Sequence, residues 1–246
     1  MSRLLSLYWP PLLLLASWQA WVSLARVPAI VMPAPLAVAG ELAAHPDFYL
    51  REGGITLATA LAGLLAGAVA SVLLAAGAWF SPYATAALTW PVLLIQATPI
   101  VALMPVIARV LGYDQRTVVA SAALITLFPT LALVAAGLRA EPRGSADVFA
   151  VLGAGRLTRL RLLALPAAVP NLLTALRISS ANCILAALVA EYLMGTSGLG
   201  RDFALAEGSF RLPAAWAAAL VATALSTIAF SLSRRIEASL GRMFRA

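Results

Sequence analysis

Long uncharged apolar stretches recur along this chain and indicate the solvent in which it folds. Residues 4–25, 53–108, 117–138 and 212–233 carry no charged side chain. A helix needs about 20 mostly apolar residues to cross the hydrocarbon layer of a membrane. With 62% hydrophobic and 11% charged residues, the chain also has too little polar surface for a soluble domain of its length. The sequence therefore predicts an all-α integral membrane protein.

The apolar stretches predict six transmembrane helices within one domain that covers residues 1–246. The break at Ser81-Pro82-Tyr83 divides the longest stretch into two spans, and a fifth span contains Arg177 and Glu191 near its ends. The core of the domain is expected at about 53–233. Gly63 and Gly67 share one helix face and would let another helix approach closely, although such spacings also arise by chance. The six spans are expected near 4–25, 56–80, 86–108, 117–138, 172–194 and 212–233.

The basic residues are sorted by membrane side. All 17 of them are arginine. If the N-terminus is cytoplasmic, most arginines fall on the inner side, while those on the outer side are balanced by acidic residues. An excess of arginine in cytoplasmic loops is the usual determinant of topology. We therefore expect both termini to be cytoplasmic, and the basic pI of 10.7 needs no nucleic acid to explain it.

The residue inventory excludes several classes of chemistry. A phosphate-binding P-loop requires a lysine, which this chain lacks. The single histidine, His45, and the single cysteine, Cys183, leave no multi-ligand metal site and little material for a catalytic triad. The chain is therefore not expected to be an enzyme or to bind a metal or cofactor itself.

The inner loop at 139–171 carries the most distinctive pattern. It has no long polar linker, so we expect short helices at the membrane face. Val148 and Phe149 would dock into a partner or into the bundle, and Gly153 would mark a turn. Arg156, Arg159 and Arg161 would face phospholipid headgroups or an acidic partner surface.

This loop resembles the cytoplasmic signature EAA-x3-G-x9-I-x-L-P of permeases in binding-protein-dependent ABC importers. The spacing agrees without a gap. Gly153, Leu165 and Pro166 match outright, whereas Asp147 stands for Glu, Val148-Phe149 for the two alanines and Leu163 for Ile. Val189-Ala-Glu191 with the following Ser197-Gly-Leu-Gly200, and Gln96-Ala-Thr-Pro99, look like segments of the nitrate/sulfonate/taurine/bicarbonate subfamily.

The resemblance implies a type I permease in a bacterial inner membrane. Its partners would be an ABC ATPase dimer that binds ATP and Mg²⁺, a second and identical permease copy, and an extracytoplasmic substrate-binding protein. The coupling region would comprise Asp147, Val148, Phe149, Gly153, Leu163, Leu165 and Pro166. The solute would be a nitrate-, sulfonate-, taurine- or bicarbonate-like anion, or a vitamin precursor. Membrane lipid is the remaining partner.

Polar residues within the spans are the candidates for the solute pathway: Gln96, Thr98, Asn182 and Glu191. A buried carboxylate in lipid is costly and therefore a functional candidate. Glu191 nevertheless lies near the outer end of its helix, where a structural role in holding the following turn is the favoured interpretation. The main alternative function is a secondary transporter that needs no ATPase; it would be expected to show paired intramembrane charges or an inverted repeat.

Overall fold

The computed structural model describes residues 2–142, 144–195 and 197–243, and these form helices joined by short connections. The helices, in chain order, are α1 (Ser2–Leu24), α2 (Pro35–Ala44), α3 (Pro46–Trp79), α4 (Pro82–Ala97), α5 (Ile100–Leu111), α6 (Gln115–Gly137), α7 (Ser145–Val151), α8 (Arg156–Arg159), η1 (Leu160–Ala164), α9 (Leu165–Met194), α10 (Leu199–Gly208) and α11 (Leu212–Met243). The element η1 is one π-helical turn that leads into α9. The predicted all-α class is confirmed.

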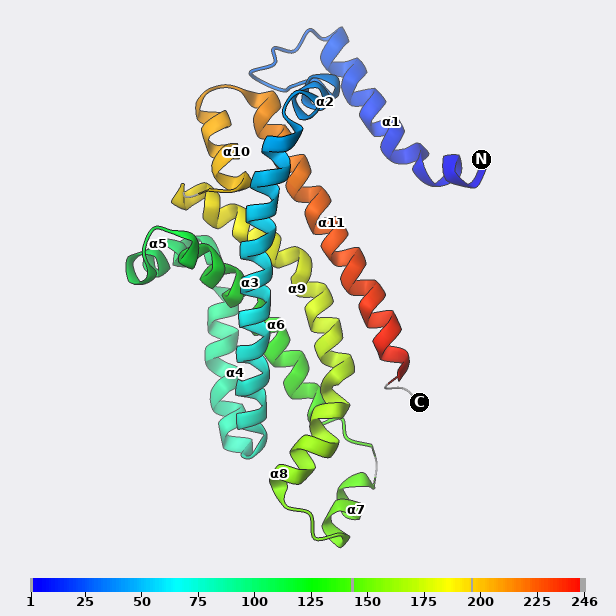
Figure 1. Cartoon of the computed structure of the whole chain (residues 1–246), viewed down its shortest axis with the longest axis vertical. Coiled ribbons are helices and arrows are strands. Elements are labelled where there is room, and N and C mark those ends of the chain that lie inside the picture. The colour runs from blue at the N-terminus through cyan, green and yellow to red at the C-terminus, as the bar shows by residue number, and fades with distance from the viewer. Residues whose placement is uncertain (1, 143, 196, 244–246) are drawn as a thin grey trace.

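Helices α3, α6 and α9 form the centre of the bundle, and α11 packs on α9 (Figure 1). A Cβ atom added at Gly63 would lie 2.7 Å from the carbonyl oxygen of Val119, and one at Gly67 would lie 2.9 Å from Cβ of Thr126. Only glycine permits this separation of α3 and α6. The close approach predicted from Gly63 and Gly67 is therefore confirmed.

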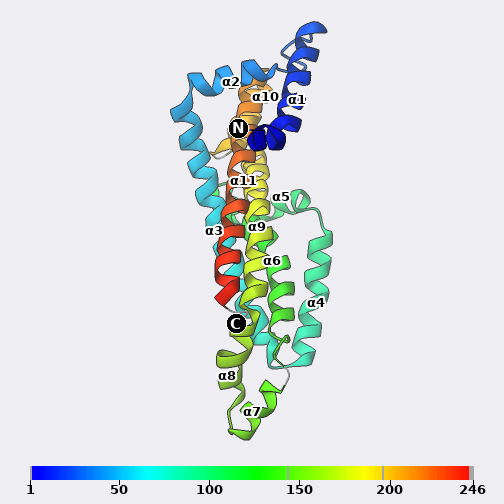
Figure 2. The ribbon, with the colours of Figure 1, turned by 90° about the vertical axis from the view of Figure 1, so that its right-hand side faces the viewer.

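Four helical segments in the described part of the chain are long and apolar enough to cross a membrane: Pro46–Trp79, Gln115–Gly137, Arg156–Met194 and Leu212–Gly241. The single span expected at 86–108 is instead divided into α4 and α5. The break falls at Thr98-Pro99, because proline lacks an N–H group and disfavours the helical conformation of the residue before it. Helix α4 runs beside α3, and α5 turns away at the C-terminal end of α4 (Figures 1 and 2).

The two ends of the bundle carry different elements. Helices α7 and α8 project beyond the end where α6 finishes, whereas α2 and α10 cover the opposite end (Figures 1 and 2). Helix α1 leans away from the bundle beside the N-terminal part of α11, and the ring centroids of Trp18 and Trp216 are 5.0 Å apart. The loop at 139–171 therefore lies at the end expected to face the cytoplasm.

Candidate coupling surface and transport pathway

Helix α7 and the residue that follows it present exposed apolar side chains. Val148 is 56% exposed, Val151 88% and Leu152 75%, and no residue of α7 is buried. Asp147 lies in the first turn, where a carboxylate interacts favourably with the helix dipole. Phe149 is partly buried. Gly153 follows with φ +66°, a left-handed conformation that disfavours side chains with a Cβ atom and ends the helix.

The second half of the predicted coupling region behaves differently, because it belongs to the bundle. Leu160 and Ala164 are buried against α6 in a cluster with Val134 and Leu138. Leu163, in η1, is partly buried, and Leu165 begins α9. Pro166 directly follows the π-helical turn η1, inside a helix that runs from α8 into α9, and its missing N–H removes one backbone hydrogen bond there. The predicted region thus combines an exposed segment, α7, with an anchored one.

Two arginines of α8 contact their own chain instead of facing only headgroups or a partner. Arg156 Nη2 donates to the carbonyl oxygen of Phe80 over 2.8 Å. Arg159 Nε and Nη2 donate to Oε2 of Glu141 over 3.2 and 2.5 Å. The sequence did not predict these contacts, because the partners lie in other segments that no local pattern connects to α8; Arg156 is still exposed, and the expected contact with headgroups or a partner stays a prediction. Arg161 is exposed, as expected.

Two of the predicted pathway residues meet at one cavity. A cavity of about 400 Å³ lies where the break between α4 and α5 faces α6 and α9. Thr98 and Asn182 both line it, with Pro99, Leu103 and Phe128 among their apolar neighbours. The Thr98 hydroxyl donates to the carbonyl oxygen of Leu94 over 3.0 Å. The side chain of Gln96 lies outside the described residues.

Glu191 lies in a separate, buried network at the C-terminal end of α9. Its Oε2 accepts hydrogen bonds from the Thr56 hydroxyl (2.8 Å) and the Gly200 N–H (3.0 Å). The Thr56 hydroxyl in turn accepts from the Leu199 N–H over 2.9 Å. Glu191 does not line the cavity at Thr98. These contacts favour the structural interpretation of Glu191, as the holder of the turn that begins α10.

A second carboxylate supports the same turn. Glu52 Oε2 accepts a hydrogen bond from the Gly198 N–H over 2.9 Å, and its Oε1 pairs with Arg51. Asp202 lies in α10, where burial and then the nearby Glu52 charge raise the pKa of its carboxyl group to about 6. The single sequence signal for this network was Ser197-Gly-Leu-Gly200, because close packing on Glu191 requires glycine at 198 and 200.

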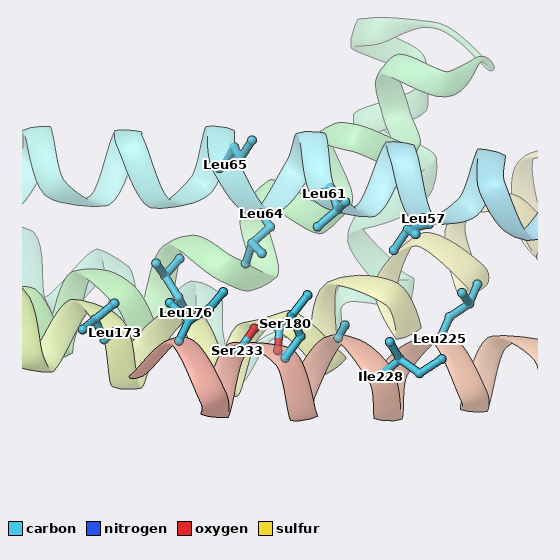
Figure 3. Close-up of a pocket in the computed structure, with 13 residues that line it drawn as sticks. Leu57, Leu61, Leu64, Leu65, Leu173, Leu176, Ser180, Leu225, Ile228 and Ser233 are labelled. Atoms are coloured by element: carbon cyan, nitrogen blue, oxygen red, sulfur yellow. The ribbon is translucent and has the colours of Figure 1, made fainter. Parts of the chain in front are cut away.

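A further groove lies between α3, α9 and α11 (Figure 3). It has a volume of about 340 Å³, and leucines such as Leu61, Leu64 and Leu176 dominate its walls. Ser180 and Ser233 supply the only hydroxyl groups among its lining residues. None of the predicted pathway residues lines this groove.

The long apolar helices are those of an integral membrane protein. Residues 63–242 match the family described as "Binding-protein-dependent transport system inner membrane component". The chain belongs to this family, and it is therefore a permease of the binding-protein-dependent ABC importer class.

Individual relatives agree with this assignment. The chain is 30% identical over 87% of its length to a probable ABC transporter permease protein of Haemophilus influenzae, covering 87% of that protein. It is 31% identical over 90% of its length to the riboflavin transport system permease protein RibX of Chloroflexus aurantiacus, covering 84% of it. It is 27% identical over 77% of its length to the putative aliphatic sulfonates transport permease protein SsuC of Bacillus subtilis, covering 70% of it.

A solved structure shares the fold. The crystal structure of an amino acid ABC transporter with histidines superposes with a TM-score of 0.65 at 15% identity, covering 82% of this chain and 97% of that one. At this identity the likeness concerns the fold alone. The predicted family is confirmed by the sequence matches.

Proposed function

We propose that this chain is the membrane-spanning subunit of an ATP-driven importer and that α7 is the element that contacts its ATPase. The exposed apolar side chains of Val148, Val151 and Leu152 carry this proposal. Recognition of an apolar helix face by a groove on a partner is a recurrent mode of binding. The ATPase would bind the ATP and Mg²⁺, in keeping with the absence of lysine from this sequence.

The proposed assembly contains two copies of this chain in a bacterial inner membrane. Helix α1 and the broken pair α4–α5 would complete six spans, with both termini on the cytoplasmic side together with α7. A substrate-binding protein would dock at the opposite end, which α2 and α10 cover. Transport would then alternate between two bundle conformations that ATP binding and hydrolysis favour in turn.

Replacing Val151 with aspartate tests the role of α7. Because Val151 is 88% exposed, the change should leave folding intact, whereas a charge placed in an apolar interface should abolish co-purification of the ATPase. The measurement is the amount of ATPase subunit retained with tagged permease in mild detergent. Leu205→Asp is the matched control, since Leu205 is 51% exposed on α10 at the other end. Equal ATPase retention by the two variants would contradict the proposal.

We further propose that the cavity at Thr98 and Asn182 belongs to the solute pathway. Its aliphatic and aromatic walls, with one amide and one hydroxyl group, suit a solute that has a sizeable apolar or aromatic face. This composition supports a vitamin-like aromatic compound over a small inorganic anion. A relative named for riboflavin transport, at 31% identity, supports the same choice.

Asn182→Leu and Thr98→Val test the pathway. In proteoliposomes that contain the ATPase and the binding protein, uptake of labelled riboflavin and of an aliphatic sulfonate is compared. We expect riboflavin uptake, and a roughly tenfold reduction of it in Asn182→Leu, because one hydrogen bond to the solute is lost. Thr223→Val is the control, since Thr223 is exposed on α11 and bonds its own helix as Thr98 does. Unchanged uptake in both cavity variants would exclude the cavity from the pathway.

A further inference from the structure

The anchored part of the coupling region holds the turn between α3 and α4. The Arg156 guanidinium lies 6.0 Å from the centroid of the Phe80 ring and also donates to the Phe80 carbonyl oxygen. The Arg159 guanidinium lies 5.7 Å from the centroid of the Trp79 ring. Trp79 and Phe80 are the last residues before the turn into α4. Helix α8 is therefore fastened to the end of α3 by two arginine–aromatic contacts.

Arg159 also connects α8 to the segment between α6 and α7. Arg159 forms its ion pair with Glu141, whose side chain is only 10% exposed. Trp79 Nε1 donates to the carbonyl oxygen of Leu138, at the end of α6, over 3.2 Å. Arg159, Trp79 and Glu141 thus join three segments that are remote in sequence. A charge-assisted hydrogen bond to a mostly buried carboxylate is stronger than a surface ion pair.

This arrangement contrasts with α7. No residue of α7 is fully buried and Val151 is 88% exposed, so α7 can follow a partner with little loss of contact to the bundle. Any displacement that continues into α8 must either break the arginine contacts or move the α3–α4 turn. The turn leads into α4, and α4 ends at the Thr98-Pro99 break that lines the cavity.

We propose that Arg159, assisted by Arg156, is a positioning residue that transmits movement of the coupling region to the α3–α4 turn and so to the cavity. This inference rests on the proposed function, because it requires an ATPase acting on α7. Arg159 does not contact the ATPase or the solute in this mechanism. It keeps α8, the end of α3 and the end of α6 moving as one body. A second route, through the continuous helix from α8 into α9, remains when the arginine is removed.

The experiment compares Arg159→Gln and Trp79→Leu with the control Arg161→Gln in proteoliposomes that contain the ATPase and the binding protein. Arg161 is the matched control because it is exposed in the neighbouring turn. The quantity measured is solute transported per ATP hydrolysed, together with ATPase retention. We expect both test variants to keep the ATPase and to lose about five- to tenfold in transport per ATP, as for one lost arginine–aromatic contact. The control should keep the wild-type ratio.

The double variant and a conservative variant separate transmission from mere stability. Arg159→Gln combined with Trp79→Leu should lose less than the sum of the two single changes, because the arginine–aromatic contact is shared, although each residue also has a partner of its own, Glu141 or the Leu138 carbonyl. Arg159→Lys keeps the charge opposite Glu141 and should restore part of the solute transported per ATP. If Arg159→Gln lowers the yield of folded protein, Arg159→Lys takes its place in the comparison. A wild-type transport-to-ATP ratio in both single variants, or additive losses in the double variant, would overturn the inference. Failure of the wild-type chain to retain any ATPase would instead contradict the proposed function.

Discussion

Replacing Gly67 with alanine is expected to cause a large loss of stability, because α3 and α6 touch backbone to backbone at this position. The added Cβ atom would overlap the carbonyl oxygen of Ala123 and lie 2.9 Å from Cβ of Thr126. Neither neighbour is the flexible end of a long side chain, so the two helices would have to separate. Overpacking of a close-packed interior costs about 1–3 kcal/mol, and more where the backbone must shift.

Separation of the two helices would also strain a hydrogen bond one turn further along. The Ser71 hydroxyl donates to the carbonyl oxygen of Leu127 over 2.8 Å and thereby joins α3 to α6. Thermal unfolding of the detergent-purified protein measures the effect. Gly77→Ala is the matched control, because Gly77 lies in the same helix and no atom is within 4 Å of the site of its added Cβ. Similar unfolding temperatures for the two variants would show that α3 and α6 are not held at this separation.

Glu191→Leu is expected to have a comparable effect at the C-terminal end of α9. Glu191 is 1% exposed, and leucine would leave both the Thr56 hydroxyl and the Gly200 N–H without an acceptor. Each unsatisfied buried donor costs about 1–3 kcal/mol. Glu191→Gln keeps an acceptor oxygen in the same place and should be markedly milder. The measurement is again thermal unfolding, together with the yield of folded protein.

The control for this second prediction is Glu207→Leu. Glu207 is exposed on α10 and accepts one hydrogen bond, from the Tyr192 hydroxyl. Its loss should change stability only slightly. A well-folded Glu191→Leu variant with an altered choice between riboflavin and sulfonate would instead return Glu191 to the solute pathway. A folded Glu191→Gln variant with unchanged uptake would support the structural role.

The fold class followed from hydropathy, but the course of the helices between the spans did not. Helix α3 begins at Pro46 rather than near 56, since a helix continues outside the apolar layer where hydropathy gives no signal. The positions of the prolines alone also did not locate the break between α4 and α5. Pro91, Pro105 and Pro129 lie inside helices, whereas Pro99 lies between α4 and α5 as the N-cap of α5. Which proline breaks a span depends on the helices that pack around it.

The candidate site was predictable where its residues are close in sequence. Motif spacing singled out the loop at 139–171, which contains the exposed helix α7, and the rarity of polar side chains in spans singled out Thr98 and Asn182, which line one cavity; the coupling and pathway roles stay predictions. The destinations of Arg156 and Arg159 were not predictable, because Phe80, Trp79 and Glu141 become their neighbours only when three helix ends meet. The Glu191 network likewise depends on Thr56, which is remote in the chain.

The exposure of α7 has an evolutionary consequence. Because no residue of α7 is fully buried, and Val148 and Val151 are exposed, substitutions at these two positions are little restricted by the need to fold. If α7 contacts the ATPase as proposed, the identity of its exposed residues would be set by the ATPase that it fits, and the two surfaces could diverge together in separate lineages. Such a segment would act as a replaceable determinant of partner specificity. The bulky Val148-Phe149 pair stands in place of the two alanines of the family signature. Such a difference would keep one importer from binding the ATPase of another.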